Sequence, residues 1–431
     1  MFYNLTLKVK KNIWFIPSAY CLVASLLAFA VIWLDTIHGK KIEAMVPATL
    51  LISVELAQTI LGILAAALLT MITITFSTIM VVLTTYSTQF SPRTLSDFVT
   101  NKVTMRVLGV YMGGFMYSIL SLLFMREDLE HEVMAGTLGV LLSIVCLAFF
   151  AYFIHHVATS IQVNKLIFGV THHTLQAFRE RLKPNVKNEV IVLANDKPKI
   201  ELGAYKVEQV RSKSFGYIQL IQVDDLFKLA KKHNFVIEIV PTMGSFLTTN
   251  KVMFKIYYEK DMPTINMHKF IEFGTNRTIL QDVDFGIQKI VEVVVRALSP
   301  GMNDPNTAID GILHLGKLLA TACKQNGSYV LYLDDGEVRV FAPKKTVEEL
   351  LYTTFYQICH YGRDDISIIL ATYDALIMVA EENDESIKKK IWSFSRYLYK
   401  SFNTDTCQEL DLHYLHEKIA ALREVTEGAK N

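Results

Sequence analysis

The sequence has few cysteines, almost no net charge and none of the short motifs that mark common enzymes. Its five cysteines lie far apart, without a Cys-x-x-Cys pair or a Cys–His spacing suited to zinc, which argues against a disulfide framework and a zinc site. The formal net charge of +1 gives no reason to expect a nucleic-acid partner. Because no P-loop, Gly-x-Ser-x-Gly elbow, His-Glu-x-x-His pair or dinucleotide fingerprint occurs, we expect neither enzymatic activity nor a cofactor.

The chain has 431 residues, of which 51% are hydrophobic. Long hydrophobic runs fill most of its first third. A helix needs about 20 apolar residues to cross a bilayer. Four segments reach this length, at about 13–34, 48–80, 105–125 and 133–158. The second continues as a predicted helix to Gln89, and a helix of that length measures about 50 Å, against about 30 Å of hydrocarbon. It must therefore tilt strongly or project from the membrane.

Basic residues outside these segments predict that both chain termini lie in the cytoplasm. Lysines and arginines precede the first segment, separate the second from the third and follow the fourth. The stretch 126–132, between the third and fourth segments, is mostly acidic. Because cytoplasmic loops carry the excess of positive charge, we expect a multi-pass membrane protein with a large soluble domain inside the cell.

One face of the second hydrophobic segment carries a stripe of small and polar residues, which we call the seam. The seam consists of Glu55, Thr59, Gly62, Ala66, Thr70, Thr73, Ser77, Val81, Thr84 and Thr88. Steps of three and four residues repeat over three helical turns, so the stripe stays within an arc of roughly 100°. The remaining faces are mainly Leu, Ile, Met, Val and Phe.

The seam has two interpretations. Small residues allow helices to pack closely, and Thr or Ser hydroxyls can bond to the carbonyl four residues back. Alternatively, several copies of the helix could surround a water-filled pore, with a slight right-handed supercoil. The pore-lining candidates would then be Glu55, Thr59, Thr70, Thr73, Ser77, Thr84 and Thr88. A ring of Glu55 carboxylates at the outer end would attract cations.

A proline ends the second predicted helix on its cytoplasmic side. Pro92 cannot continue the helical hydrogen-bond ladder, and it disfavours helix at Ser91. Ser91 also suits an N-cap, with Pro92 at the first position of the next helix. The corner formed by Ser91, Pro92 and Arg93 lies at the predicted boundary between membrane and cytosol, and is therefore our candidate for a gating element.

The remainder of the chain predicts an α+β cytosolic domain behind an α-helical membrane domain of residues 1–160. Residues 161–280 begin with a linker helix and continue with short β-branched and aromatic runs typical of strands. Within them, residues 235–254 are similar to the small barrel of lipoyl-type domains, so we expect a β-barrel-like module without an attached cofactor. Residues 281–431 predict a mainly helical module interrupted by one hairpin.

Charged and amide residues gather around the start of the mainly helical module. This polar cluster consists of Arg277, Asp282, Asp284, Arg296, Asn303, Asp304, Thr307 and Asp310. Helix capping explains part of it, because Asp304 before Pro305 is a typical N-cap and Asn303 suits the preceding turn. Alternatively, the oxygen atoms could hold a divalent cation or a small regulator. Both interpretations stay open, and the identity of any metal is unknown.

Three motifs occur in order behind the four hydrophobic segments. They are Phe90-Ser-Pro-Arg93, Arg277-Thr278 followed by Gln281-Asp-Val-Asp-Phe-Gly286, and Ala297-Leu-Ser-Pro-Gly-Met-Asn-Asp-Pro-Asn-Thr-Ala308. Together they resemble the predicted bacterial membrane proteins catalogued as domain of unknown function 2254, over almost the whole chain. The resemblance implies a protein of the bacterial cytoplasmic, or inner, membrane, and it implies no activity.

These patterns favour a homo-oligomeric channel that conducts small ions and is gated by its large cytosolic domain. In this interpretation the seam lines the pathway and the corner at Arg93 transmits motion. The competing hypothesis is a non-conducting membrane-anchored sensor or scaffold, whose inner domain binds a ligand or a protein. A secondary transporter fits less well, because no inverted repeat is visible.

Overall fold

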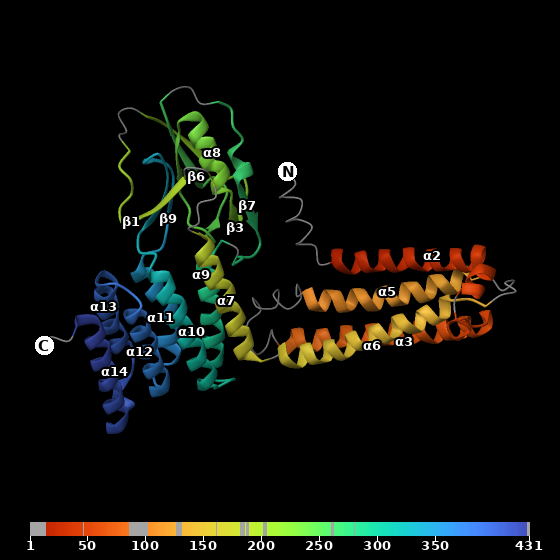
Figure 1. The fold of residues 1–431 in the computed structure, drawn as a ribbon. Helices are drawn as coiled ribbons and strands as arrows, with labels where there is room; N and C mark the ends of the chain where they lie inside the picture. The colour runs from red at the N-terminus through yellow and green to blue at the C-terminus, as the bar shows by residue number, and fades with distance from the viewer. Residues whose placement is uncertain are drawn as a thin grey trace. The chain divides into compact units, whose positions relative to one another are not determined.

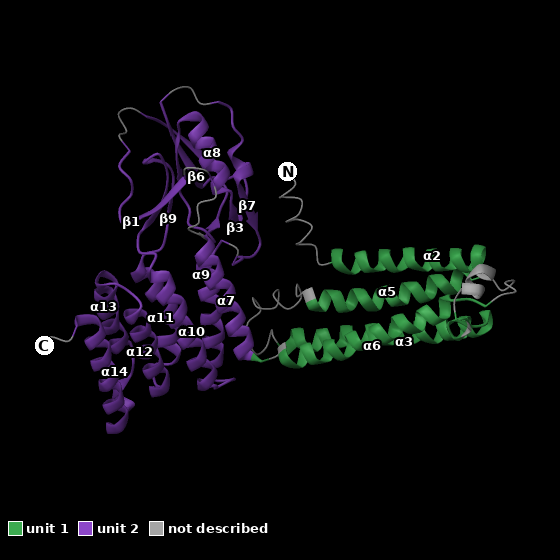
Figure 2. Ribbon diagram, in the orientation of Figure 1, with its two compact units in different colours: residues 1–162 green, residues 163–431 purple. Residues whose placement is uncertain are grey.

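The computed structural model describes residues 14–45, 47–85, 102–125, 132–160, 162–181, 186, 189–200, 205–259, 263–279 and 281–428. The chain divides into two compact units, residues 1–162 (unit 1) and 163–431 (unit 2), which are green and purple in Figure 2. Each unit has a hydrophobic core of its own.

Unit 1 is helical throughout most of its described part. Its elements are α2 (Phe15–Met45), the short 3-10 helix η1 (Ala48–Leu50), α3 (Val54–Thr85), α5 (Lys102–Phe124) and α6 (Ala135–Ser160), as shown in Figure 1. Four of these helices are long and apolar enough to cross a membrane, as predicted. The 32 residues of α3 make it about 48 Å long, which exceeds the thickness of the hydrocarbon layer.

Two adjacent glycines allow α5 to lie close to α2, α3 and α6. A Cβ atom added to Gly113 would lie 3.3 Å from the carbonyl oxygen of Tyr20 in α2. One added to Gly114 would lie 2.9 Å from Cys146 Sγ in α6 and 3.2 Å from Leu68 in α3. A larger side chain at either position would push these helices apart.

The helical part of unit 2 surrounds one apolar core. Its helices are α7 (Val163–Arg181), α9 (Val283–Ala297), α10 (Pro305–Cys323), α11 (Val347–Tyr361), α12 (Ile366–Glu381), α13 (Glu385–Ser401), the 3-10 helix η5 (Thr404–Thr406) and α14 (Glu409–Glu427). Polar side chains define where several of them begin. For example, Thr346 and Glu349 form a reciprocal capping box at the start of α11, and Asp384 accepts amide hydrogen bonds at the start of α13.

The described strands of unit 2 form two sheets. They are β1 (Glu189–Ala194), β2 (Lys206–Arg211), β3 (Gly216–Ile221), β4 (Val236–Ile239), β5 (Phe246–Leu247), β6 (Val252–Tyr258), β7 (Ile271–Gly274), β8 (Tyr329–Asp334) and β9 (Glu337–Pro343), with α8 (Val223–His233) and the 3-10 helix η4 (Met267–Phe270) between them. Six strands pair in the order β1-β8-β9-β4-β6-β2, and three in the order β5-β3-β7. Leu226 and Phe227 of α8 are buried in the core that these sheets share.

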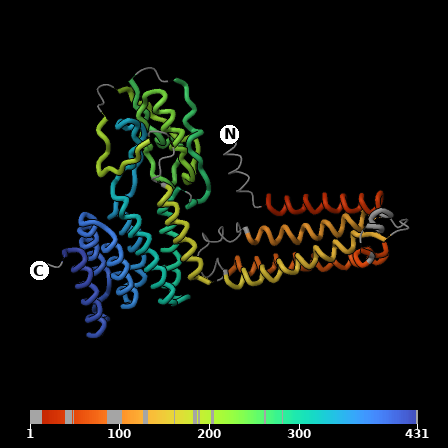
Figure 3. Tube along the Cα trace, viewed as in Figure 1, coloured from red at the N-terminus to blue at the C-terminus, as the bar shows by residue number. Residues whose placement is uncertain are grey.

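The predicted β-barrel-like module is not supported, because the described strands form open sheets rather than a closed barrel. The hairpin β8–β9, with its turn at Asp335-Gly336, inserts between β1 and β4, and β9 pairs with β4 in parallel. In Figure 3 the trace of this hairpin, drawn in cyan, lies among the strands of residues 189–274, drawn in yellow-green to green. The alternation of side chains predicts strands, but it does not specify a partner so distant in sequence.

Candidate functional site

The seam lies on the exposed side of α3. The buried residues of α3 are Ala57, Leu61, Ala65, Leu68, Thr75 and Val82, and they form its contacts inside unit 1. Every seam residue from Glu55 to Thr84 is exposed except Gly62, which is half-buried. A Cβ atom added to Gly62 would have no other atom within 4 Å. Within the described residues, therefore, no helix of unit 1 covers the seam.

The threonine hydroxyls of the seam donate hydrogen bonds to their own helix. Those of Thr59, Thr70, Thr73 and Thr84 reach the carbonyl oxygen four residues earlier, at 2.9–3.0 Å. Because a hydroxyl has one hydrogen and two lone pairs, each oxygen can still accept a hydrogen bond or contact a cation. The buried Thr75 bonds in the same way, so back-bonding alone does not distinguish the seam.

Part of the predicted conduction pathway lies outside the described residues. This holds for Thr88 at the end of the seam and for the gating corner of Ser91, Pro92 and Arg93. The last described residue of α3 is Thr85.

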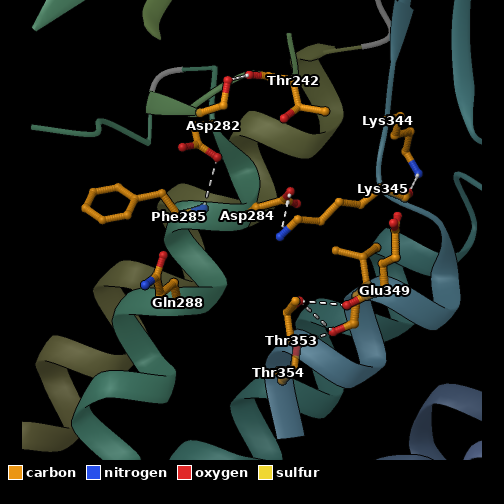
Figure 4. Close-up of polar contacts among 12 residues, drawn as sticks. Thr242, Asp282, Asp284, Phe285, Gln288, Lys344, Lys345, Glu349, Thr353 and Thr354 are labelled. Atoms are coloured by element: carbon orange, nitrogen blue, oxygen red, sulfur yellow. Dashed lines mark hydrogen bonds and ion pairs between the residues drawn. The ribbon is translucent and has the colours of Figure 1, made fainter. Parts of the chain in front are cut away.

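Within unit 2, Arg277 and Asp282 form a bidentate ion pair at the start of α9. Arg277 Nε lies 2.6 Å from Asp282 Oδ2, and Nη2 lies 2.9 Å from Oδ1. Asp282, only 3% exposed, also accepts the amide hydrogen of Phe285 and so caps α9 (Figure 4). The pKa of the Asp282 carboxyl is raised, because burial raises it by more than the Arg277 guanidinium lowers it.

The space next to this ion pair is too small for an organic ligand. A cavity of about 20 Å³ is lined by Asp282, Asp284, Thr242, Lys345 and seven further residues. Lys345 Nζ lies 3.4 Å from Asp284 Oδ2 on its wall (Figure 4). Since one water needs roughly 10–15 Å³, the cavity has room for about one water molecule.

The other members of the polar cluster lie at the far end of α9. Asp304 caps α10, because Thr307 donates to it from its amide at 3.1 Å and from its hydroxyl at 2.6 Å. Asn303 occupies the left-handed region that the preceding turn needs, with φ of 46°. Arg296 lies in the last turn of α9, where a positive charge interacts favourably with the helix dipole. As α9 has 15 residues, its two ends are about 21 Å apart, so the cluster does not form one site.

Asp310, in the second turn of α10, lies one turn before His314. The Nδ1 atom of His314 lies 3.1 Å from the hydroxyl of Thr171 in α7. Burial lowers the pKa of His314, and the Asp310 carboxylate opposes this shift. Among the described residues, no group of three or more His, Cys, Asp or Glu side chains could hold a metal ion.

The structure also reveals a polar contact in unit 1 that is not among the residues predicted from the sequence. Asp35 in α2, 3% exposed, accepts the amide hydrogens of Met134 and Ala135 at 3.1–3.2 Å. It thereby caps the start of α6 from another helix. The Tyr117 hydroxyl of α5 donates to the carbonyl of Ala135 at 2.9 Å. An acidic residue near the end of an apolar segment was the signal available in the sequence.

Four apolar helices followed by a mixed α/β unit define a membrane protein with a large second unit. The chain belongs to the family described as "Predicted membrane protein (DUF2254)", whose model matches residues 10–378. This finding confirms the family resemblance inferred from the three motifs.

Relatives among curated proteins come from mycobacteria. The chain is 27% identical over 337 residues to "Uncharacterized protein Mb1321c" of Mycobacterium bovis and to "Uncharacterized protein Rv1290c" of Mycobacterium tuberculosis. The matched region covers 75% of this chain and 64% of each relative, so the chain spans less than two thirds of their length. No solved structure matches the chain.

Proposed function

We propose that this protein is a homo-oligomeric channel in which the seams of several α3 helices line a pathway for small ions. The observation that carries the proposal is the orientation of the seam, which lies on the one side of α3 that unit 1 leaves uncovered. Packing among the described residues of unit 1 therefore does not explain why small and polar residues recur at nearly every turn of a long apolar helix.

Lipid is a poor explanation for such a face. A helix surface that meets only acyl chains needs no hydroxyls, and larger apolar side chains would make more contacts there. The other exposed residues of α3 include Leu56, Ile63, Leu69 and Phe76, which suit lipid. The seam is thus suited either to another copy of α3 or to water enclosed by several copies.

The chemistry of the seam favours cations over anions. Each back-bonded threonine presents oxygen lone pairs rather than a hydrogen to the space outside the helix. The exposed carboxylate of Glu55 stands in the first turn of α3, and a ring of such carboxylates would concentrate cations at one mouth. The proposed channel performs no enzymatic chemistry.

Gating is assigned to unit 2. We place both termini and unit 2 in the cytoplasm of a bacterial cell, in accordance with the positive-inside rule. The corner at Ser91, Pro92 and Arg93 follows α3 in the chain, and α7 of unit 2 follows α6, so a rearrangement of unit 2 would act on the inner ends of these helices.

The alternative is a membrane-anchored sensor or scaffold in which the seams of several copies form a dry interface. The back-bonded hydroxyls favour this second function, because they need no water to satisfy their hydrogens. The sensor or scaffold binds a ligand or a protein through unit 2, and it differs from the channel in having no conducting pathway along the assembled seams.

Single-channel recording in planar bilayers, with asymmetric potassium chloride, tests the proposal. We expect unitary currents whose size falls in Ser77→Leu and Thr84→Leu, because leucine narrows and dries the pathway, and a reversal potential that indicates cation preference. Thr78→Leu is the matched control: it changes the same chemistry on a neighbouring face and should leave the unitary current unchanged.

Two results would overturn the proposal. One is a protein that remains monomeric in mild detergent, since a pore around a shared axis needs several copies. The other is electrical silence that persists across voltage, membrane tension, pH and divalent cations, which would favour the sensor or scaffold.

A further inference from the structure

Two loops of unit 2 lie side by side where its two sheets meet. Residues 212–215 connect β2 to β3, and residues 248–251 connect β5 to β6, so both loops cross between the sheets. The amide of Ser212 donates to the carbonyl of Lys251 at 2.8 Å, and the amide of Asn250 donates to the carbonyl of Ser212 at 2.8 Å. These hydrogen bonds hold the loops together as one surface.

Two phenylalanines project from this surface. The side chain of Phe215 is 72% exposed and that of Phe246 is 53% exposed, although their ring centroids lie only 6.5 Å apart. The ring of Tyr217 packs edge-on against that of Phe246, with the two centroids 5.2 Å apart. Paired aromatic rings left open to water are a typical sign of a binding surface rather than of a folding core.

The charge around the phenylalanines is positive. Lys213 and Lys251 are exposed on the two loops and Arg211 is exposed at the end of β2, and no acidic residue occurs in the stretches 209–223 and 239–258. We call Arg211, Lys213, Phe215, Phe246 and Lys251 the aromatic tip.

An open groove of about 720 Å³ runs beside the tip and contains Arg211, Lys213 and Asn250 in its wall. Glu208 and His268 also line the groove. Burial and then the charge of Lys213 lower the pKa of His268, which agrees with a positive local potential. Among the described residues that line the groove, Glu208 is the single acidic one, whereas Arg211 and Lys213 both carry positive charge.

We infer that the aromatic tip docks on the anionic phospholipid surface of the bilayer that holds unit 1. Phe215 and Phe246 would enter the boundary between headgroups and acyl chains, where aromatic rings are favoured. Lys213, Lys251 and Arg211 would contact lipid phosphates, to which basic residues beside a membrane are attracted.

The chain itself argues for lipid as the occupant. Unit 2 is covalently tethered to a unit with four helices that can span a membrane, so a bilayer surface is present at high effective concentration. A lipid surface is fluid and needs no shape complementarity, which suits two protruding rings flanked by flexible lysines. The docking site is independent of whether α3 conducts ions, because it involves only unit 2.

Quenching by brominated phospholipids tests the inference on the full-length protein in vesicles. Phe215→Trp introduces a reporter, and the wild-type spectrum is subtracted to remove Trp14, Trp33 and Trp392. In vesicles that contain brominated phosphatidylglycerol, we expect the added emission to be shifted to shorter wavelength and strongly quenched. Tyr414→Trp serves as the control, because it is 51% exposed on α14 near acidic residues and should show neither effect.

Charge reversal separates lipid contact from its electrostatic cause. Adding Lys213→Glu and Lys251→Glu to the Phe215→Trp protein should restore most of the added emission, as should high salt, which screens exposed charges. Phosphatidylcholine vesicles with the same bromine content should quench less than anionic vesicles.

Three outcomes would overturn the inference. Emission of the Phe215→Trp reporter that stays at long wavelength and unquenched in anionic vesicles would show that the tip remains in water. A shift to shorter wavelength without quenching would show that protein, such as a second copy of the chain, covers the tip. Quenching that is equal in neutral and anionic vesicles and insensitive to charge reversal would exclude the assigned role of the lysines.

Discussion

In the polar cluster around α9, carboxylates contact groups of their own unit, whereas the polar residues of the seam lie on the exposed face of α3. Asp282 is 3% exposed and both of its oxygens bond to Arg277. Asp304 accepts two hydrogen bonds from Thr307. Glu55 and Thr73 on the seam are exposed, and the hydroxyl of Thr73 reaches only its own helix.

The difference separates residues that stabilise the fold from residues available to something outside it. A polar group next to a proline or at a helix start can cap that helix, and in the polar cluster the structure provides its hydrogen-bond partners. A polar stripe that follows the helix period along an apolar segment has no such local role. Its exposure within the chain therefore makes it the better candidate for assembly or conduction.

The largest effect on stability is expected at Asp282. Replacing it with alanine removes the carboxylate that pairs with the Arg277 guanidinium, whose hydrogen bond to Gln288 remains, and it removes the cap of α9. The free energy of unfolding of unit 2 should fall by about 3 kcal/mol. Urea unfolding followed by the fluorescence of Trp392 would measure this change, in protein with Trp14 and Trp33 replaced by phenylalanine. Conduction per open channel should be unaffected.

Asp282→Asn is the control for that variant. Because an asparagine oxygen can still cap α9, the free energy of unfolding should fall less in Asp282→Asn than in Asp282→Ala. If Asp282→Ala unfolds at the wild-type urea concentration, the ion pair contributes nothing, and Asp282 becomes available for a role other than stability.

A smaller effect is expected at Asp35 in unit 1. Asp35→Ala removes the acceptor of two amide hydrogens at the start of α6 and should destabilise unit 1 by about 1–2 kcal/mol. Glu55→Ala provides the comparison, because Glu55 is an exposed acid in the first turn of α3, and its loss should lower the thermal unfolding temperature in detergent much less than Asp35→Ala does. Equal losses of stability in the two variants would contradict the distinction between buried polar residues that stabilise unit 1 and exposed ones that do not.

The apolar helices could be predicted from the sequence because length and hydropathy suffice for them. Hydropathy predicts the first span at about 13–34, and the apolar helix observed there is Phe15–His38. Helix α12 was also foreseeable, since Asp365 caps it and apolar residues recur along it. Helix spans and helix caps depend on residues that are close in the sequence, so the sequence pattern contains the information that predicts them.

Contacts between distant residues could not be predicted in this way. The pairing of β4 with β9 joins Ile237 to Val340, and it replaced the expected barrel-like module with an open sheet. Asp35 bonds to an amide 99 residues later, so nothing beside it in the sequence indicates its role. The polar cluster was grouped by proximity in sequence, but α9 holds its two halves apart. The period of the seam was visible in the sequence, whereas its exposure required the structure.

The smallest effect on folding is expected on the seam, where two threonines of α3 form a matched pair. Thr73 is exposed and Thr75 is 0% exposed, although both donate to the carbonyl four residues back. Thr75→Leu should overpack unit 1 and cost about 1–3 kcal/mol. Thr73→Leu should change the stability of the monomer in detergent by less than about 0.5 kcal/mol.

The same pair separates folding from assembly when the oligomer is measured. Thr73→Leu should shift the protein toward smaller species in size-exclusion chromatography with light scattering, because leucine disturbs the contact between seams. A Thr73→Leu protein that assembles normally and also unfolds as easily as Thr75→Leu would mean that the seam packs inside unit 1. In that case α3 would have no face left for a partner copy or for water, and the comparison on which the channel proposal rests would fail.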